Sequence, residues 1–332
     1  MSPSPPGHLV RLFALLGLVA TIVASAAPAR GGDEAGSPAC VHGAVIERGD
    51  AGAQALYEGI RLGLERARWQ RVCEELPPPD QGPEALVRRW RERFEAARAR
   101  GDVEPWLFVV GEALPPVELA ALAALPHVVA RTGYAIAGEP LDAAVPAAPR
   151  RGVVRGLAEA AWVGERLRAW CGRERPRVLW RGAGAEATVT RFLAAAEVDV
   201  VGERTPGREG EGVVFDAVLH LRLDAAPRAP FDQALAAARA GGAPLVSDDR
   251  GRFGDGAALV LVPDHDLIGR VTADVARRLA LAEEDAPRER AVSAMRTWID
   301  LEACDRQGLD VPWGLLASTD RLRRGRPSER PR

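Results

Sequence analysis

Short polar loops that follow apolar, strand-like runs carry the residues whose chemistry could hold a ligand. Asp224 closely follows the run 216–221, and Asp248 directly follows the run 244–247. A carboxylate at either point could accept hydrogen bonds from a ligand ammonium group. Gly49-Asp50 and Gly182 come just before predicted helices, where backbone N–H groups can hold a ligand carboxylate. These features predict a binding site for a small charged solute.

Further candidates lie in the same kind of loop. Gly111 and Glu112 follow an apolar run, and Tyr134 could supply an aromatic wall. Ligands of open α/β sheets bind outside the carboxyl ends of the strands, so these loops should share one edge. The predicted ligand-binding residues are Gly49, Asp50, Gly111, Glu112, Tyr134, Gly182, Asp224 and Asp248.

Each candidate also has a plainer interpretation. Asp50 can cap its own helix, and Gly182 can serve only the close packing of a strand against a helix. Tyr134 can pack at the surface, and the two aspartates can cap helices or join two lobes by polar contacts. The acidic pair in Asp264-His265-Asp266 resembles a metal or acid–base cluster, but we interpret it as a turn that caps the following helix.

Motifs of catalysis are missing from the sequence. The chain has no Lys, so a P-loop lysine and a Schiff base are excluded, and arginine cannot replace them because it does not deprotonate. We find no G-x-S-x-G, no H-E-x-x-H and no zinc-type Cys/His spacing. We therefore expect no enzyme, no cofactor and no metal, with an unrecognised α/β enzyme as the remaining alternative.

Four cysteines are present, and none forms a C-x-x-C pair. Cys40 precedes the first predicted strand and Cys73 lies in the second. Neighbouring strands could bring Cys40 and Cys73 together as a disulfide in an exported chain. Buried free thiols are the alternative.

The N-terminus has the pattern of a secretory signal peptide. An apolar run over 12–27 ends in Ala24-Ser25-Ala26, a small-residue cleavage pattern. The run is shorter than the roughly 20 residues of a membrane span, although an uncleaved anchor is the alternative. We expect a signal peptide over 1–29 and a periplasmic or secreted protein. Without it the chain carries 43 basic and 46 acidic side chains, which argues against binding to nucleic acid.

Strand-like and helix-like patterns alternate along the remainder of the chain, which predicts parallel sheets covered by helices. The alternation pauses in the Ala- and Pro-rich stretch 137–149 and then restarts, giving two α/β units. The expected strands are 41–46, 70–75, 106–110, 127–130, 177–180, 198–202, 216–221, 244–247 and 257–262. The expected helices are 53–68, 83–100, 117–125, 157–171, 185–196, 231–240 and 267–282.

The C-terminal segment resembles a known family. Residues 256–270 read as a strand followed by Asp-His-Asp-Leu-Ile-Gly-Arg, and 298–317 contain Asp-Leu-Glu-Ala with Gly-Leu-Asp-Val-Pro-Trp-Gly-Leu-Leu. This arrangement is similar to the closing segment of bacterial ABC-transporter substrate-binding proteins, a family that includes binders of aromatic amino acids. The match is best over 216–323. Asp224 and Asp248 fall at family positions that are usually acidic, whereas Glu112 replaces a residue that is usually small or hydroxylated.

The resemblance implies a fold and a division of the chain. The fold is α/β with two Rossmann-like lobes, each built on a parallel sheet and joined by a hinge, as in type I periplasmic binding proteins. It implies that 40–149 plus 264–323 form one lobe, 150–263 form the other and 324–332 form a disordered tail. The hinge would consist of crossings near Pro149, Asp264 and Glu284.

The resemblance also implies a function. The chain would be an exported, monomeric protein that closes its lobes around a small, amino-acid-like molecule. It would present that ligand to an ABC permease and its ATPase subunits. A sensory or accessory binding protein, read by a membrane receptor, is the alternative.

Overall fold

A computed structural model describes most of the chain after residue 41. The described residues are 42–46, 51–66, 74–76, 83–100, 105–111, 120–122, 125–135, 150–201, 214–223, 228–283 and 286–324. The expected signal peptide, the Cys40–Cys73 pair, the loop 137–149 and most of the tail 324–332 lie outside the described residues. Among the described residues, no helix is both long and apolar enough to cross a membrane.

The first sheet contains six strands in the order β11-β5-β4-β3-β1-β2, and every pairing within it is parallel. The central strands are β1 (His42–Ile46), β3 (Trp106–Val110) and β4 (His127–Ala135). β3 is buried throughout, and so are the apolar residues of β1 and of the first half of β4. The remaining strands are β2 (Glu74–Leu76), β5 (Arg151–Glu159) and β11 (Glu289–Val292).

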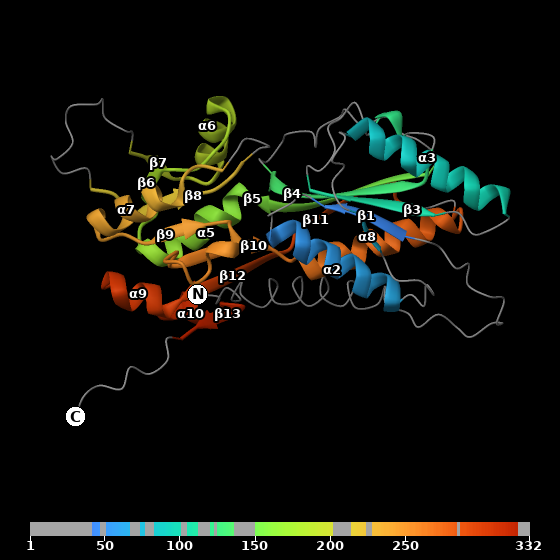
Figure 1. Cartoon of the computed structure of the whole chain (residues 1–332). Helices are drawn as coiled ribbons and strands as arrows, with labels where there is room; N and C mark the ends of the chain where they lie inside the picture. The colour runs from blue at the N-terminus through green and yellow to red at the C-terminus, as the bar shows by residue number, and fades with distance from the viewer. Residues whose placement is uncertain are drawn as a thin grey trace, which may run out of the picture. The chain divides into compact units, whose positions relative to one another are not determined.

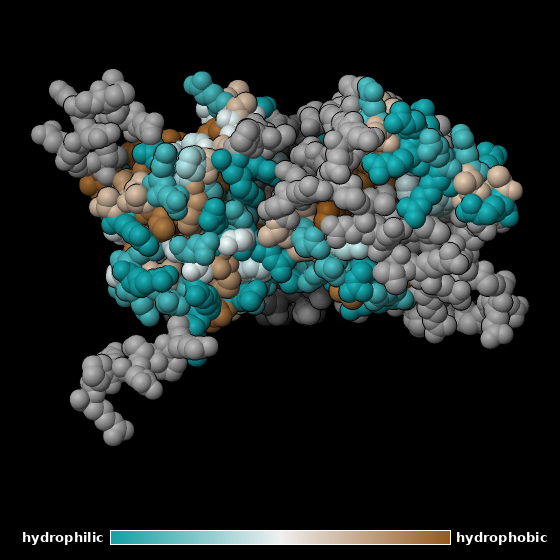
Figure 2. Space-filling model, viewed as in Figure 1, coloured by the Kyte–Doolittle hydropathy of each residue, from teal (hydrophilic) through white to brown (hydrophobic). Residues whose placement is uncertain are grey.

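Helices cover both faces of this sheet (Figure 1). On one face, α2 (Ala51–Arg66) and α8 (His265–Ala280) pack on alternate strand residues that include Phe108 and Val128. On the other face, α3 (Pro83–Ala99) buries Trp90 and Phe94 against residues that include Val109. The outward side of α3 is hydrophilic (Figure 2). The two-residue period of the strands therefore divides the apolar side chains between two helix layers.

The contact between α2 and α8 depends on glycine. A Cβ at Gly269 would lie 2.4 Å from the carbonyl carbon of Gly59, and a Cβ at Gly59 would lie 2.7 Å from the carbonyl oxygen of His265. Gly63 faces Ala273 one turn further along. The small residues at these positions let the two helices approach until their backbones touch.

The second sheet contains seven strands in the order β13-β12-β10-β9-β8-β6-β7. Its pairings are parallel except that of β10 (Leu259–Pro263) with β12 (Met295–Asp300), which is antiparallel. The other strands are β6 (Arg177–Trp180), β7 (Asp199–Val200), β8 (Ala217–His220), β9 (Leu245–Ser247) and β13 (Arg321–Arg323).

Helices also lie on both faces of the second sheet. On one face, α5 (Ala160–Cys171), α6 (Glu186–Ala195), α9 (Leu301–Gln307) and α10 (Trp313–Ala317) form a core with strand residues such as Leu219 and Ile299. On the other face, α7 (Phe231–Gly241) packs against Val218 and Val260. A short 3-10 turn, η1 (Arg250–Arg252), follows β9.

The sheets divide the chain differently from the expected lobe boundaries. Residues 151–159 form β5 of the first sheet, although the sequence analysis assigned 150–263 to the other lobe and began a helix at Leu157. Residues 295–323 join the second sheet through β12 and β13, although they were expected to return to the first lobe. The chain therefore crosses between the sheets three times: at Glu159, at Asp264 and at 293–294. The crossing at Asp264 is where it was expected, whereas the other two lie away from Pro149 and Glu284.

Sheet pairing explains both corrections, since β12 joins the second sheet through β10 and β5 joins the first through β4. The β5 run contains Arg, Gly and Glu and lacks a clear alternation, but it pairs with nine consecutive residues of β4. The same pairing extends β4 to Ala135, so Arg131–Tyr134 is strand and not the loop that was expected after Ala130. Strand partners 24 residues apart in the sequence supply hydrogen bonds that local propensity does not reveal.

Candidate functional site

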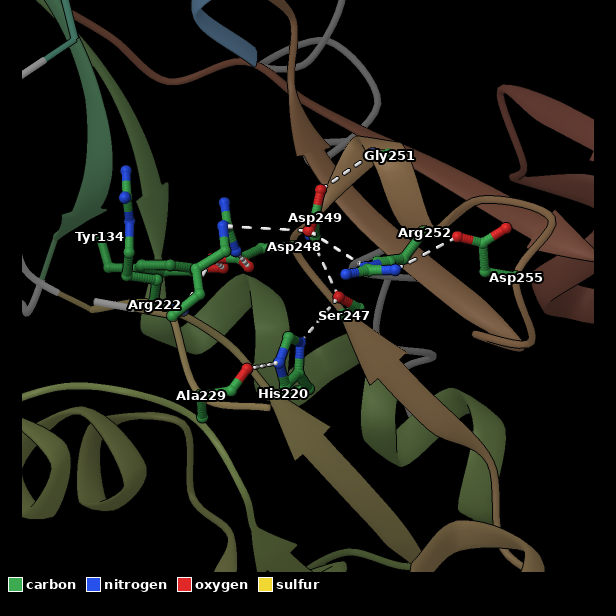
Figure 3. Close-up of polar contacts among 11 residues, drawn as sticks. Tyr134, His220, Arg222, Ala229, Ser247, Asp248, Asp249, Gly251, Arg252 and Asp255 are labelled. Carbon is green, nitrogen blue, oxygen red and sulfur yellow. Dashed lines mark hydrogen bonds and ion pairs between the residues drawn. The ribbon is translucent and has the colours of Figure 1, made fainter. Parts of the chain in front are cut away.

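Asp248 is the centre of a polar network at the carboxyl end of β9 (Figure 3). Its Oδ2 atom accepts hydrogen bonds from the Tyr134 hydroxyl at 3.1 Å and from the Arg222 backbone N–H at 2.9 Å. Its Oδ1 atom accepts one from Nη1 of Arg228 at 2.6 Å. The Asp248 side chain is only 10% exposed, so donors of the chain itself stabilise its charge.

Arg228 connects Asp248 to the next turn. Its Nε atom lies 4.0 Å from Oδ2 of Asp249. The other oxygen of Asp249 accepts a hydrogen bond from the Gly251 N–H at 2.9 Å and so caps η1. Nε of Arg252 approaches the same carboxylate at 3.6 Å. The result is a chain of alternating charges that holds the loop after β9 in one conformation.

A buried histidine lies below this network (Figure 3). Nε2 of His220 is 2.9 Å from the Ala229 carbonyl oxygen, and Nδ1 is 3.2 Å from the Ser247 hydroxyl. A carbonyl can only accept, so Nε2 carries the proton and Nδ1 accepts from Ser247. Ser247 in turn accepts from the Asp249 N–H at 3.1 Å. His220 and Ser247 are 2% and 0% exposed. This hydrogen-bonded pair therefore stabilises the interior and is not accessible to a substrate.

Tyr134 brings the first sheet to this network. Its ring contacts Phe192 of α6 edge-on, with centroids 5.0 Å apart, and its hydroxyl donates to Asp248. Burial raises the pKa of Tyr134 well above its usual value of 10, and the Asp248 carboxylate raises it further. The phenol therefore stays a hydrogen-bond donor at neutral pH.

A hollow of about 410 Å³ opens at the ends of β6 and β7 beside the start of α7. Trp180, Val200 and Pro230 give it apolar walls, and Gly182 lines it as well. A Cβ at Gly182 would lie 2.2 Å from the Leu221 carbonyl oxygen and 2.5 Å from the Trp180 ring. Glycine at this position thus allows the loop after β6 to lie flat against β8 and the indole.

The structure places four of the eight predicted ligand residues. It brings Tyr134 and Asp248 together, and it places Gly182 in the hollow. Gly111 forms the turn after β3, with a φ of 73° that favours glycine, and its N–H donates to the Ala130 carbonyl. The remaining four lie outside the described residues: Gly49, Asp50, Glu112 and Asp224.

Sequence reasoning missed Arg228, Ser247 and His220 as members of the site. Arg228 lies in a loop with no periodic pattern, and His220 and Ser247 are the last residues of the apolar strands β8 and β9. The polar residues at the ends of these buried runs were the available indication, because a buried polar side chain needs a partner. Which partner it finds depends on the pairing of β8 with β9.

The cluster Asp264-His265-Asp266 forms a helix start, as its sequence predicts. Asp264 accepts a hydrogen bond from the Leu267 N–H at 3.1 Å and is the N-cap of α8. Arg296 bridges Asp264 at 2.8 Å and Asp266 at 3.4 Å. In the part of the chain that the structure describes, no group of three or more His, Cys, Asp or Glu side chains is placed to hold a metal ion.

Comparison with known proteins identifies the fold. No protein-family model and no curated protein sequence matches the chain. A ligand-free, open substrate-binding protein with adhesive properties from Clostridium difficile matches at a TM-score of 0.58 and 10% identity, over 86% of this chain and 100% of that one. An ABC domain from Streptococcus pneumonia in complex with L-Trp matches at 0.55 and 12%, over 84% and 99%.

A conserved domain protein from Vibrio cholerae is also similar, at a TM-score of 0.54 and 16% identity, over 86% of this chain and 100% of that one. Such low identities establish the fold and nothing finer. The chain therefore has the two-sheet α/β fold of type I periplasmic binding proteins, and the fold class predicted from the sequence is confirmed.

Proposed function

We propose that this chain is a solute-binding protein that holds a small organic molecule at the carboxyl ends of its parallel strands. Open α/β sheets bind their ligands at this edge, and the polar network around Asp248 lies at it. The chain shares its fold with a substrate-binding protein and with a domain bound to L-Trp, which supports the same role.

The hydrogen bond from Tyr134 to Asp248 is the observation that carries this proposal. It joins the end of β4 in the first sheet to the end of β9 in the second. A protein that closes around a solute needs contacts of this kind, which form in one state and are absent from the other. A ligand shifts that equilibrium only as far as it binds one state better than the other.

Export and delivery complete the proposal. The apolar run over 12–27 would direct the chain to the periplasm or outside the cell, and the closed form would present an amino-acid-like ligand to an ABC permease with its ATPase subunits. No chemistry on the ligand is part of this role. The buried Ser247–His220 pair supports that view, because its hydroxyl is turned inward to the imidazole.

Thermal unfolding with a panel of amino acids, sugars, polyamines and small carboxylates tests the proposal. A ligand at 100 times its dissociation constant should add about 2.7 kcal/mol to the stability of the folded state. Asp248→Asn should weaken binding of the ligand found, because the neutral amide no longer holds Arg228 by charge.

Asp255→Asn is the matched control. Asp255 is 54% exposed and lies 3.4 Å from Arg252, so the same chemical change there should leave ligand binding unaltered. If no compound of the panel shifts the unfolding temperature, the solute-binding role is wrong for this chain.

A further inference from the structure

We propose that Arg228 fills the cation position beside Asp248 and thereby keeps the ammonium groups of solutes away from that carboxylate. This inference rests on the proposed solute-binding function and identifies a residue that determines its specificity. The sequence suggested that Asp248 could accept hydrogen bonds from a ligand ammonium group. In the structure, a guanidinium of the same chain lies where such a group would bind.

The described donors to Asp248 are one charged group and two neutral groups (Figure 3). Oδ1 accepts from Nη1 of Arg228 at 2.6 Å. Oδ2 accepts from the Tyr134 hydroxyl and from the Arg222 backbone N–H, and neither of these donors carries a charge. A carboxylate that is only 10% exposed needs a cation beside it, because its desolvation is costly. Arg228 supplies that cation.

The chain holds this guanidinium in place from two sides. Nε of Arg228 lies 4.0 Å from Oδ2 of Asp249, so a second carboxylate attracts it. The next residue, Ala229, is fixed to the interior, because its carbonyl oxygen accepts a hydrogen bond from the buried His220 at 2.9 Å. The cation position is therefore filled before any solute arrives.

The covalent tether gives Arg228 an advantage over a free cation. A group attached by a short flexible chain competes at an effective concentration on the order of millimolar. A solute amine loses translational and rotational freedom when it binds, whereas Arg228 loses only the motion of its side chain. An amine at micromolar concentration should therefore not displace Arg228 through this contact alone. An amino-acid-like solute that binds the parent chain would place its ammonium group away from Asp248.

Removal of the Arg228 side chain should open the position to small cations. Arg228→Ala leaves a largely buried carboxylate with two neutral donors. N-ethylguanidinium reproduces the deleted atoms, n-propylammonium carries an ammonium group on a similar chain, and N-ethylurea is the uncharged counterpart of the first compound. Titration of each compound, followed by ligand-observed NMR, compares the variant with the parent chain.

Both cations should bind Arg228→Ala roughly ten times more tightly than the parent chain, or better, while N-ethylurea should gain little. Arg228→Lys should resemble the parent chain, because its ammonium group stays tethered. The double variant Arg228→Ala with Asp248→Asn should lose the gain, since no charge remains to attract a cation. Arg228→Gln removes the charge and keeps most of the stem, so it carries the same test with a smaller gain if Arg228→Ala does not fold.

Arg252→Ala is the matched control. Arg252 belongs to the same network, but its side chain is 42% exposed and faces Asp249 and Asp255 rather than Asp248. This substitution deletes the same atoms and should not create a site for either cation.

The thermal panel connects the position to the choice of solute. Arg228→Ala should respond more strongly than the parent chain to polyamines and other ammonium-bearing compounds, relative to sugars and small carboxylates. Loss of a purely structural contact would instead weaken the response to all compounds alike.

The inference is overturned if neither cation gains affinity for a folded Arg228→Ala chain, or if the double variant with Asp248→Asn keeps the gain. A panel compound that binds the parent chain, together with either result, leaves the solute-binding function standing. A gain of both cations with no panel compound bound by the parent chain rejects the function and, with it, the role of Arg228 in solute choice.

Discussion

The crossing of α2 and α8 gives a prediction whose size follows from the structure. Gly269→Ala would place a Cβ 2.4 Å from the Gly59 carbonyl carbon, 2.5 Å from the Ile60 nitrogen and 2.6 Å from the Gly59 Cα. Carbon atoms in contact normally lie about 3.5–4.0 Å apart. The two helices would have to separate by roughly 1 Å, and backbone atoms cannot rotate away as a side chain can.

Two effects of opposite sign determine how much Gly269→Ala changes the free energy of unfolding. Overpacking of a fitted core costs about 1–3 kcal/mol. Alanine in place of glycine inside a helix returns about 0.5–1 kcal/mol. The separation also weakens contacts of both helices with the sheet, among them those of Ile60 and Val275. We expect a net loss of about 1–2 kcal/mol or more, which lowers the melting temperature by roughly 2–8 °C.

Urea unfolding followed by circular dichroism measures this loss. Gly314→Ala in α10 is the control, because a Cβ there meets nothing within 4 Å; the substitution should leave stability unchanged or raise it by up to about 1 kcal/mol. Gly59→Ala should rank between the two, since its closest contact is 2.7 Å from the His265 carbonyl oxygen. Equal stability of Gly269→Ala and the parent chain would refute the close backbone contact.

Other measurements check further features. Burial lowers the pKa of His127 from 6.5 to about 4, so the folded state favours the neutral imidazole. The contribution of His127 to the free energy of unfolding is therefore complete above pH 6.5. It falls by about 3 kcal/mol as the pH drops to 4. His127→Gln should flatten that part of a melting-temperature profile, and an unchanged slope would contradict the assignment. Tyr134→Phe should cost about 1–2 kcal/mol, since it removes a hydrogen bond to a carboxylate that keeps two other donors. Because the pKa of Tyr134 is raised, its phenol stays protonated in the folded state, so the parent chain loses stability as the pH rises above 10 and the variant loses less. Burial raises the pKa of Cys171 and of Cys304 to about 12, so both thiols should react with iodoacetamide at neutral pH only after unfolding. Alkylation of the unreduced, unfolded chain then tests the predicted Cys40–Cys73 disulfide, since two modified cysteines support the bridge and four exclude it.

Local patterns in the sequence were enough to predict many elements of the fold. The alternation of apolar strands and amphipathic helices predicted β3, β8 and α7 nearly at their observed bounds. A capping residue was equally informative: Asp264, interpreted from the sequence as part of a capping turn, is the N-cap of α8. These features depend on neighbours within about four residues, where periodicity and backbone preferences act directly.

Only the tertiary structure decided which strand joins which sheet and which side chains of the site contact one another. β5 lacks an apolar alternation and is a strand because β4 and β11 supply its hydrogen bonds. The sequence marked Tyr134 and Asp248 separately as candidate ligand contacts, yet they bond each other across 114 residues. Whether a carboxylate contacts a ligand or an arginine of its own chain depends on distances in the tertiary structure. Residue type and spacing along the sequence do not determine these distances.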